Sequence, residues 1–178
     1  MTYYYSPTPL EKWVSKLYWK LNISTPADLD VEVIARHFRI YIHRKEIDTF
    51  AYENGNFRSI TLDQRLPFEN QREQFYHELC HLLRHCGWQA GMMPEAFREL
   101  QEWEAKRFVP FAAIPFHMLR NFDLVNDPDV IQQLSEKFKI TPQLCIQRLE
   151  HIKRNAKSNT PQRSDPQNDR SHIHPSFH

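Results

Sequence analysis

The sequence has no excess of charge of either sign and no apolar stretch long enough to cross a membrane. Its 178 residues contain 23 Lys and Arg against 22 Asp and Glu, which gives a formal net charge of +1 at pH 7. A bilayer-spanning helix needs about 20 mostly apolar residues in a row. A near-neutral chain also gives no general reason to bind nucleic acid through a basic surface. We therefore expect no membrane span and no direct nucleic-acid binding.

Cysteine is scarce as well. The chain has three cysteines, Cys80, Cys86 and Cys145, and no two of them form a C-x-x-C pair. An odd count with no such pair argues against a disulfide framework. No hydrophobic secretory segment follows Met1. We expect free thiols and a cytoplasmic protein.

Apolar residues almost vanish from residue 155 onward, where Ser, Asn, Gln, Pro, Asp and Arg take over. Such a segment cannot bury enough apolar surface to offset the entropy lost on folding. We therefore predict one domain over residues 1–154 and a disordered tail over 155–178. The histidines of the tail, His172, His174 and His178, have no scaffold and are interpreted as incidental.

The chain does contain an H-E-x-x-H run, His77-Glu78-Leu79-Cys80-His81. Helical spacing of the apolar residues around it predicts a helix over residues 67–85. Two histidines four positions apart on a helix share one face, so both imidazoles can reach one Zn²⁺ while Glu78 projects beside them. A catalytic zinc site uses three protein ligands and leaves a fourth position for water, whose proton an adjacent carboxylate can take. The run indicates zinc hydrolase chemistry, with His77 and His81 as ligands and Glu78 as the base.

The third ligand must come from elsewhere in the chain. The longer motif with a third histidine is excluded, because Arg84 and Gly87 stand where it needs Gly and His. His85 lies one turn beyond His81, and we expect neither it nor Cys86 to reach the same ion. A second helix is predicted over residues 94–107. It carries four carboxylates, Glu95, Glu99, Glu102 and Glu104. Glu102 and Glu104 are both candidates, but they point about 200° apart around a helix, so only one can face the histidines.

This second helix resembles a pattern of the ImmA/IrrE family of metallopeptidases, E-x-E-A-N-x-F-A-x-x-L-L-x-P. Residues 102–115, Glu-Trp-Glu-Ala-Lys-Arg-Phe-Val-Pro-Phe-Ala-Ala-Ile-Pro, align with it without a gap. The resemblance implies that Glu102 is the third zinc ligand. The chain departs from the pattern at Lys106, where the family has an Asn or Asp that accepts a hydrogen bond from a ligand histidine, because a lysine cannot accept one. Pro110 is expected to interrupt the helix early.

The resemblance covers about residues 10–154 and implies an α+β class, a mostly helical zincin-like domain with a small antiparallel sheet before the H-E-x-x-H helix. Apolar periodicity and turn signals predict further elements in the same order. These are helices over residues 9–21, 25–38, 127–138 and 141–154, an extended stretch over 40–42, and a hairpin of 49–52 with 57–62 around Asn54-Gly55.

The function implied by the resemblance is that of a zinc-dependent endopeptidase. Its expected substrate is a cognate helix-turn-helix repressor of a mobile element, a phage-like region or a stress response. A sheet edge beside the zinc would hold the substrate in an extended form. Tyr76 and His117 are the candidates for an oxyanion donor. The alternative function is a non-catalytic antirepressor that keeps the fold and binds its target without cleaving it.

Overall fold

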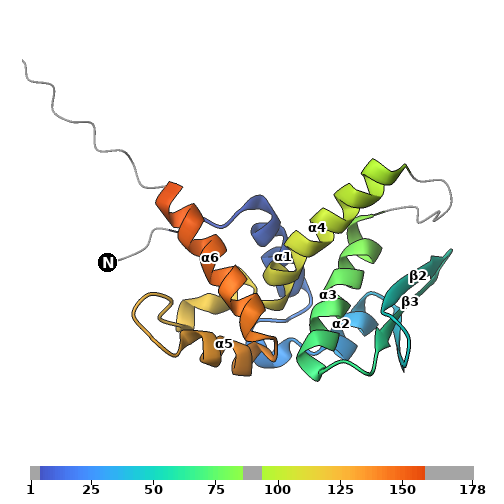
Figure 1. Ribbon diagram of the computed structural model, residues 1–178, viewed down its shortest axis with the longest axis horizontal. Coiled ribbons are helices and arrows are strands. Elements are labelled where there is room, and N and C mark those ends of the chain that lie inside the picture. The colour runs from blue at the N-terminus through green and yellow to red at the C-terminus, as the bar shows by residue number, and fades with distance from the viewer. Residues whose placement is uncertain (1–4, 86–93, 159–178) are drawn as a thin grey trace, which may run out of the picture.

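The computed structural model describes residues 5–85 and 94–158, and confirms the α+β class (Figure 1). The α-helices are α1 (Pro9–Lys20), α2 (Val31–His37), α3 (Phe68–Arg84), α4 (Glu95–Ala113), α5 (Val130–Phe138) and α6 (Pro142–Ser158). Two short 3-10 helices are η1 (Pro26–Asp28) and η2 (Phe116–Asn121), and the strands are β1 (Ile40–Lys45), β2 (Phe50–Asn54) and β3 (Phe57–Asp63). The sheet lies at one end of the molecule and α5 and α6 at the other, with α1, α3 and α4 between them (Figure 1).

Local sequence signals explain where α1 begins. The Thr8 hydroxyl accepts a hydrogen bond from the backbone N–H of Glu11 at 3.3 Å, while the Glu11 carboxylate accepts one from the N–H of Thr8 at 2.7 Å. This capping box satisfies two donors that a helix start leaves unpaired, and Pro9 in the first turn has no N–H to satisfy. The expected first helix is confirmed, and it ends at Lys20.

The sheet is mixed rather than purely antiparallel. The predicted hairpin is present as β2 and β3, and Gly55 takes a positive φ of 58° at its turn. The first strand, β1, joins the other edge of β3 in parallel, so the order is β1-β3-β2. The reason lies in burial, because residues 59–63 of β3 are all buried whereas β1 and β2 carry exposed side chains. The most buried strand takes the centre, and the chain passes from one edge to the other between β1 and β2.

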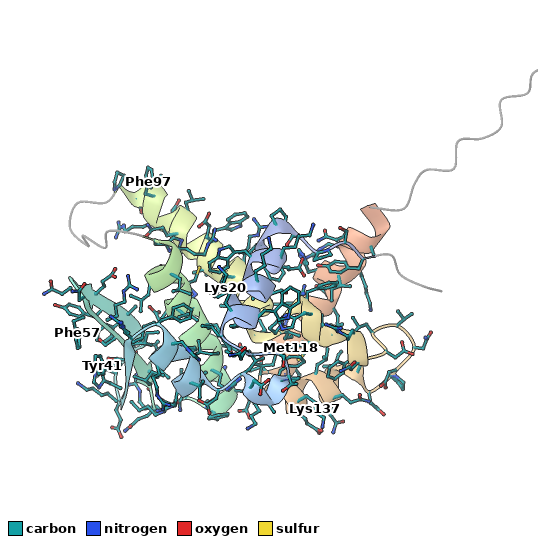
Figure 2. The ribbon with its side chains drawn as sticks, turned by 180° about the vertical axis from the view of Figure 1, so that it is seen from behind. Lys20, Tyr41, Phe57, Phe97, Met118 and Lys137 are labelled. Carbon is teal, nitrogen blue, oxygen red and sulfur yellow. The ribbon has the colours of Figure 1, made fainter. Side chains whose placement is uncertain are left out.

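Aromatic side chains project from the face of the sheet that points away from the helices. Tyr41 of β1 and Phe57 of β3 lie together at the outer end of the sheet (Figure 2). Their rings stack at 5.4 Å between centroids, and Tyr52 of β2 lies 6.2 Å from Phe57. The opposite face carries Ile60 and is packed on α3.

Two predictions about helix continuity were wrong. The helix expected over residues 25–38 is split into η1 and α2, because Asp30 starts a new helix by accepting hydrogen bonds from the N–H groups of Glu32 and Val33 at 2.8 and 3.0 Å. Pro110 does not interrupt α4, which continues to Ala113. The buried side chains on either side of Pro110, including Phe108 and Phe111, hold this turn in place.

The last helix extends past the expected boundary of the domain. Residues 155–158 belong to α6, and Ala156 is buried there together with Ile152. Burial of this apolar face continues the helix into a segment whose composition predicts disorder. Residues 159–178, including His172, His174 and His178, lie outside the described residues. In the parts of the chain that the structure describes, every helix is too short or too polar to cross a bilayer.

A buried ion pair joins the first and last helices. Arg148 of α6 has no exposed surface, and its guanidinium lies 2.5 Å from the Glu11 carboxylate of α1. The Nε–H of Arg148 also donates to the backbone carbonyl of Ile114 at 3.1 Å, just after α4. Burial alone would raise the pKa of Glu11, but Arg148 and hydrogen bonds from Tyr5 and Thr8 together hold this pKa below its ordinary value. One ionised pair therefore ties α1, α4 and α6 together.

Replacing Arg148 with Met should destabilise the protein strongly, because Glu11 would keep its buried position without its counter-charge. We expect the free energy of unfolding, measured by urea denaturation, to fall by about 3–5 kcal/mol. The matched control is Arg44→Met, which breaks a 2.7 Å pair with Glu32 in which both side chains are more than 40% exposed. The control should lose no more than about 1 kcal/mol. Equal losses in the two variants would contradict the role assigned to the buried pair.

The difference between wild type and Arg148→Met should also depend on pH. In wild type the lowered pKa of Glu11 means that its stabilisation is complete above the unfolded-state pKa, about 4.3, and is lost as the pH falls through the folded-state pKa. In the variant we expect burial without Arg148 to raise the pKa of Glu11. Protonation at low pH then removes the buried negative charge that has lost its partner. We therefore expect the gap in unfolding free energy to narrow as the pH falls from about 6 to about 3.5. A gap that stays constant over this range would contradict the assignment.

Candidate metal centre

The helix α3 presents one face to the core and another to a cleft. Phe75, Leu79 and Leu82 are buried, and α3 packs against α4, β2 and β3. His77 and His81 lie on the partly exposed side of the helix, one turn apart. The helix predicted from the motif is therefore present, and its apolar stripe sets which way the two histidines face.

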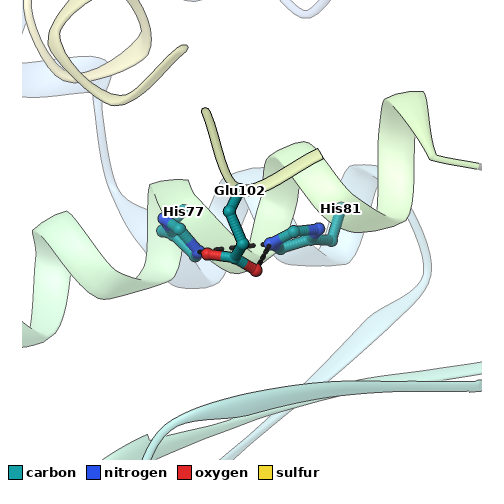
Figure 3. Close-up of side chains that lie close together, drawn as sticks. All are labelled: His77, His81 and Glu102. Carbon is teal, nitrogen blue, oxygen red and sulfur yellow. Dashed lines mark hydrogen bonds and ion pairs between the residues drawn. The ribbon is translucent and has the colours of Figure 1, made fainter. Parts of the chain in front are cut away.

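Three side chains converge at this point (Figure 3). The Nε2 atoms of His77 and His81 are 3.1 Å apart, and the two carboxylate oxygens of Glu102 each lie 3.3 Å from one of them. All three ligand atoms fall within 4.8 Å of one another. Two imidazole nitrogens and one carboxylate oxygen form a donor set suited to a catalytic metal ion, with a coordination position left for water. The chain thus holds a group that fits a metal ion.

The surroundings favour the form of each histidine that binds metal. Burial lowers the pKa of His77, and burial together with the neighbouring His77 ring lowers the pKa of His81 to about 4. The Glu102 carboxylate acts in the opposite direction on both. Both rings are therefore neutral near pH 7, and a neutral imidazole has the lone pair that a metal ion requires.

Glu78 lies beside this group and outside it. Burial, with a smaller contribution from the negative charge of Glu102, raises the pKa of Glu78 to about 7, against the lowering effect of a hydrogen bond from the backbone N–H of Ala51. Glu78 and His77 both line a cleft of about 740 Å³. A half-buried carboxyl group that opens on a cleft next to a metal group has the position required of a general base.

Most residues that line the cleft are polar, and they include His77 of the converging group and Asp63 of β3. Its walls come from α3, α4, α6 and the segments that flank β2 and β3. Thr49, just before β2, donates a short hydrogen bond to Gln74 of α3 and accepts one from the N–H of Asp63 at 3.0 Å. Lys106 lines the cleft beside His77, and its positive charge contributes to the lowered pKa of that ring. The lysine thus occupies the place where the family pattern has an acceptor.

The structure separates the two carboxylates that compete for the third position. Glu102 faces the histidine pair, whereas an oxygen of Glu104 lies 3.1 Å from Nε2 of His85 and 4.0 Å from Arg84. His85 is not a member of the converging group, as expected, although its ring contacts His81. Cys80 is buried, and burial raises its thiol pKa to about 12. Cys86, the other candidate considered, lies outside the described residues.

Neither predicted oxyanion donor is near the cleft. Tyr76 is fully buried in the core, with Arg72 against its ring and its hydroxyl. His117 is also buried, accepts or donates a 3.1 Å hydrogen bond with Ser15 of α1, and lines a different cavity. The prediction was wrong for both residues, because helical phase turns Tyr76 inward from the motif face and because η2 directs His117 toward α1.

The contact between His85 and Glu104 was not predicted from the sequence. The signal was present as a third histidine at the spacing of the first two, since His77, His81 and His85 are each four residues apart. The sequence does not indicate that the following helix places the Glu104 carboxylate against the ring of His85.

Comparison with known proteins identifies one matching family and two similar bacterial proteins. Residues 28–150 match the model of the Peptidase M78 family, described as the IrrE N-terminal-like domain. The "Phage-like element PBSX protein XkdA" of Bacillus subtilis (strain 168) is 32% identical over 146 residues, which are 82% of this chain and 73% of that protein. The "Uncharacterized protein YqaB" of the same organism is also 32% identical over 146 residues, or 84% of its length. No solved structure matches the chain significantly.

Metal binding can be tested on the three converging residues. After zinc is added and excess is removed, we expect about one zinc ion per wild-type chain, measured by elemental analysis, because the donor set matches a three-ligand site. His77→Ala and Glu102→Gln should lose this ion. The control is Glu99→Gln, which changes an exposed carboxylate of the same helix and should keep it. Full zinc content in Glu102→Gln would remove Glu102 from the ligand set.

Proposed function

Because the chain belongs to the Peptidase M78 family of IrrE N-terminal-like domains, we propose that it is a zinc-dependent endopeptidase that cleaves a DNA-binding repressor. The observation that supports this proposal most directly is the convergence of His77, His81 and Glu102 on one point, with Glu78 beside them on a cleft. Membership of a peptidase family and a donor set that leaves one coordination position open both support a hydrolytic reaction.

His77, His81 and Glu102 would hold the zinc ion. When bound, zinc supplies a Lewis acid that polarises a peptide carbonyl and lowers the pKa of water to about 7. Structural zinc sites are usually closed by four Cys or His ligands. In the described residues around this group no fourth such ligand joins it, which favours a catalytic role.

Glu78 accepts a proton and then donates it in the proposed reaction. Its carboxylate accepts a proton from the water that attacks the carbonyl carbon, and the hydrogen bond from the N–H of Ala51 holds the carboxylate in place. When the C–N bond breaks, Glu78 returns the proton to the leaving nitrogen, so that it leaves as a neutral amine. Ala51 belongs to β2, so the sheet positions the base directly.

The substrate segment is proposed to bind as an extended chain along β2. Within the described residues β2 pairs only with β3, so no strand covers its other edge. Thr49 lies just before β2 and lines the same cleft as Glu78. A peptide added at this edge gains main-chain hydrogen bonds while one of its bonds reaches the metal group. The cleft volume is in the range of ordinary ligand sites, about 300–1,000 Å³.

Two similarities to other proteins support a repressor as the substrate. The pattern of residues 102–115 resembles that of proteases that cut the repressor of a mobile element or stress response. One relative is named as a protein of a phage-like element. We therefore propose a cytoplasmic helix-turn-helix repressor, of the kind that keeps such an element silent, as the partner.

Glu78→Gln should separate cleavage from binding. The zinc-loaded protein is incubated with helix-turn-helix repressors encoded near its gene, and products are identified by mass spectrometry. Wild type should cut one of them at a defined bond, and Glu78→Gln should cut about 10²–10⁴-fold more slowly while keeping its zinc, because it lacks the proton acceptor. Glu150→Gln, which changes an exposed carboxylate of α6, serves as the control and should cut normally.

The same experiment addresses the alternative of a non-catalytic antirepressor. A repressor that leaves its operator DNA in the presence of wild type or Glu78→Gln without being shortened would contradict the protease proposal and support the antirepressor. Zinc content measured on the same samples separates a loss of chemistry from a loss of metal.

A further inference from the structure

The outward nitrogen of His81 faces a second histidine rather than solvent. Nδ1 of His81 lies 3.0 Å from Nδ1 of His85, and Nε2 of His85 lies 3.1 Å from a carboxylate oxygen of Glu104. The three side chains thus form a row that begins at the metal group and ends at Glu104. The candidate ligand itself, Glu102, lies two residues earlier on the same helix.

The row is built by two helices. His77 and His81 stand on successive turns of α3, and His85 is the residue that caps the end of this helix. The ring centroids are 4.9 Å apart for His77 and His81 and 5.0 Å apart for His81 and His85. The helix α4 packs against α3, so that Glu102 reaches the first two rings and Glu104 reaches the third. The His85 side chain is only 6% exposed. Water therefore has little access to the hydrogen bonds on either side of it.

One arrangement of protons satisfies all three groups when Nε2 of His81 binds a metal ion. If Nε2 of His81 is to offer its lone pair to a metal ion, the ring proton must sit on Nδ1. That proton is then donated to Nδ1 of His85, which must be unprotonated. His85 in turn has its proton on Nε2 and donates it to the Glu104 carboxylate, which accepts. The carboxylate at the end of the row thus selects the tautomer of His85, and His85 selects that of His81.

We propose that His85 and Glu104 are positioning residues that hold His81 in the tautomer and orientation that bind zinc. This inference rests on the metal site of the proposed function. It also explains how the chain can do without a hydrogen-bond acceptor at position 106, where Lys106 stands. His85, backed by Glu104, is the acceptor for the ring N–H of the ligand His81. Arg84, 4.0 Å from Glu104, keeps a positive charge near the end of the row.

The test is the zinc dissociation constant of the full chain, measured by competition with a chromophoric chelator. Removing an outer partner of a ligand histidine typically weakens metal affinity about 10–100-fold. We expect a loss of this size in His85→Leu and a smaller loss in Glu104→Gln. His85→Gln should retain affinity near that of wild type, because its amide oxygen can accept from His81 and its NH₂ group can donate to Glu104. Glu99→Gln is the matched control for Glu104→Gln and should bind zinc like wild type.

The double variant His85→Leu/Glu104→Gln distinguishes an indirect role from a direct one. If Glu104 acts through His85, the double variant should bind zinc no more weakly than His85→Leu alone. An additional loss in the double variant would mean that Glu104 acts on the metal separately, and would overturn the proposal. Unchanged affinity in a folded His85→Leu, checked by circular dichroism, would overturn it as well.

Nitrogen-15 chemical shifts of the histidine rings give a second readout that needs no metal. In the metal-free wild type we expect the proton of His81 on Nδ1 and that of His85 on Nε2, and a loss of this preference in His81 of the His85→Leu variant. The opposite tautomers in wild type would overturn the proposal. If the protein binds zinc but cleaves nothing, the proposed function fails while the affinities and shifts still decide the role of His85 and Glu104.

Discussion

The contact between α3 and α4 is the constraint on which the rest of the structure depends. The motif helix alone supplies two histidines, and a third donor arrives only because α4 lies against it. Ala105 is fully buried one turn beyond Glu102, and Phe108 is buried one turn further on. The small side chain of Ala105 allows the two helices to approach closely, and the ring of Phe108 packs against Trp13 of α1. Both carboxylates that matter, Glu102 and Glu104, reach α3 from this part of α4.

The remaining elements hold that contact in place. The sheet packs on α3 and places Ala51 against Glu78, so that one strand edge and the base belong to a single unit. On the other side, the buried pair of Glu11 and Arg148 joins α1 and α6, and Arg148 also binds the carbonyl of Ile114 at the end of α4. A buried ion pair of this kind adds little stability over an apolar pair, but it is specific in geometry. It fixes where the C-terminal end of α4 lies.

The polar groups of the candidate site sit in surroundings of intermediate burial. The two histidines and Glu78 are half-buried, which is enough to shift their pKa values without removing them from the cleft. Two histidines in the neutral form beside a carboxyl group with a raised pKa are the protonation states that metal binding and proton transfer need. The same burial would be a cost in a part of the protein with no ligand to bind.

Most elements could be predicted from local pattern, and the errors have a common cause. The periodicity of α1, α3, α5 and α6 is strong, and the Asn54-Gly55 turn predicts its hairpin unaided. The split at Asp30 and the continuation through Pro110 both went against local expectation, because a side-chain cap in one case and buried packing in the other outweighed propensity. The parallel place of β1 depends on which strand is buried on both faces. That is a property of the assembled sheet.

The candidate site divides along the same line. The placement of His77, Glu78 and His81 was determined by the sequence itself, since four-residue spacing on a helix puts both imidazoles on one face whatever the helix packs against. Only the tertiary structure decided that Glu102 and not Glu104 meets them, that Tyr76 and His117 point elsewhere, and that His85 links His81 to Glu104. Those facts depend on how two helices cross. Their crossing is set by side-chain packing between residues far apart in the chain, which spacing within one helix does not specify.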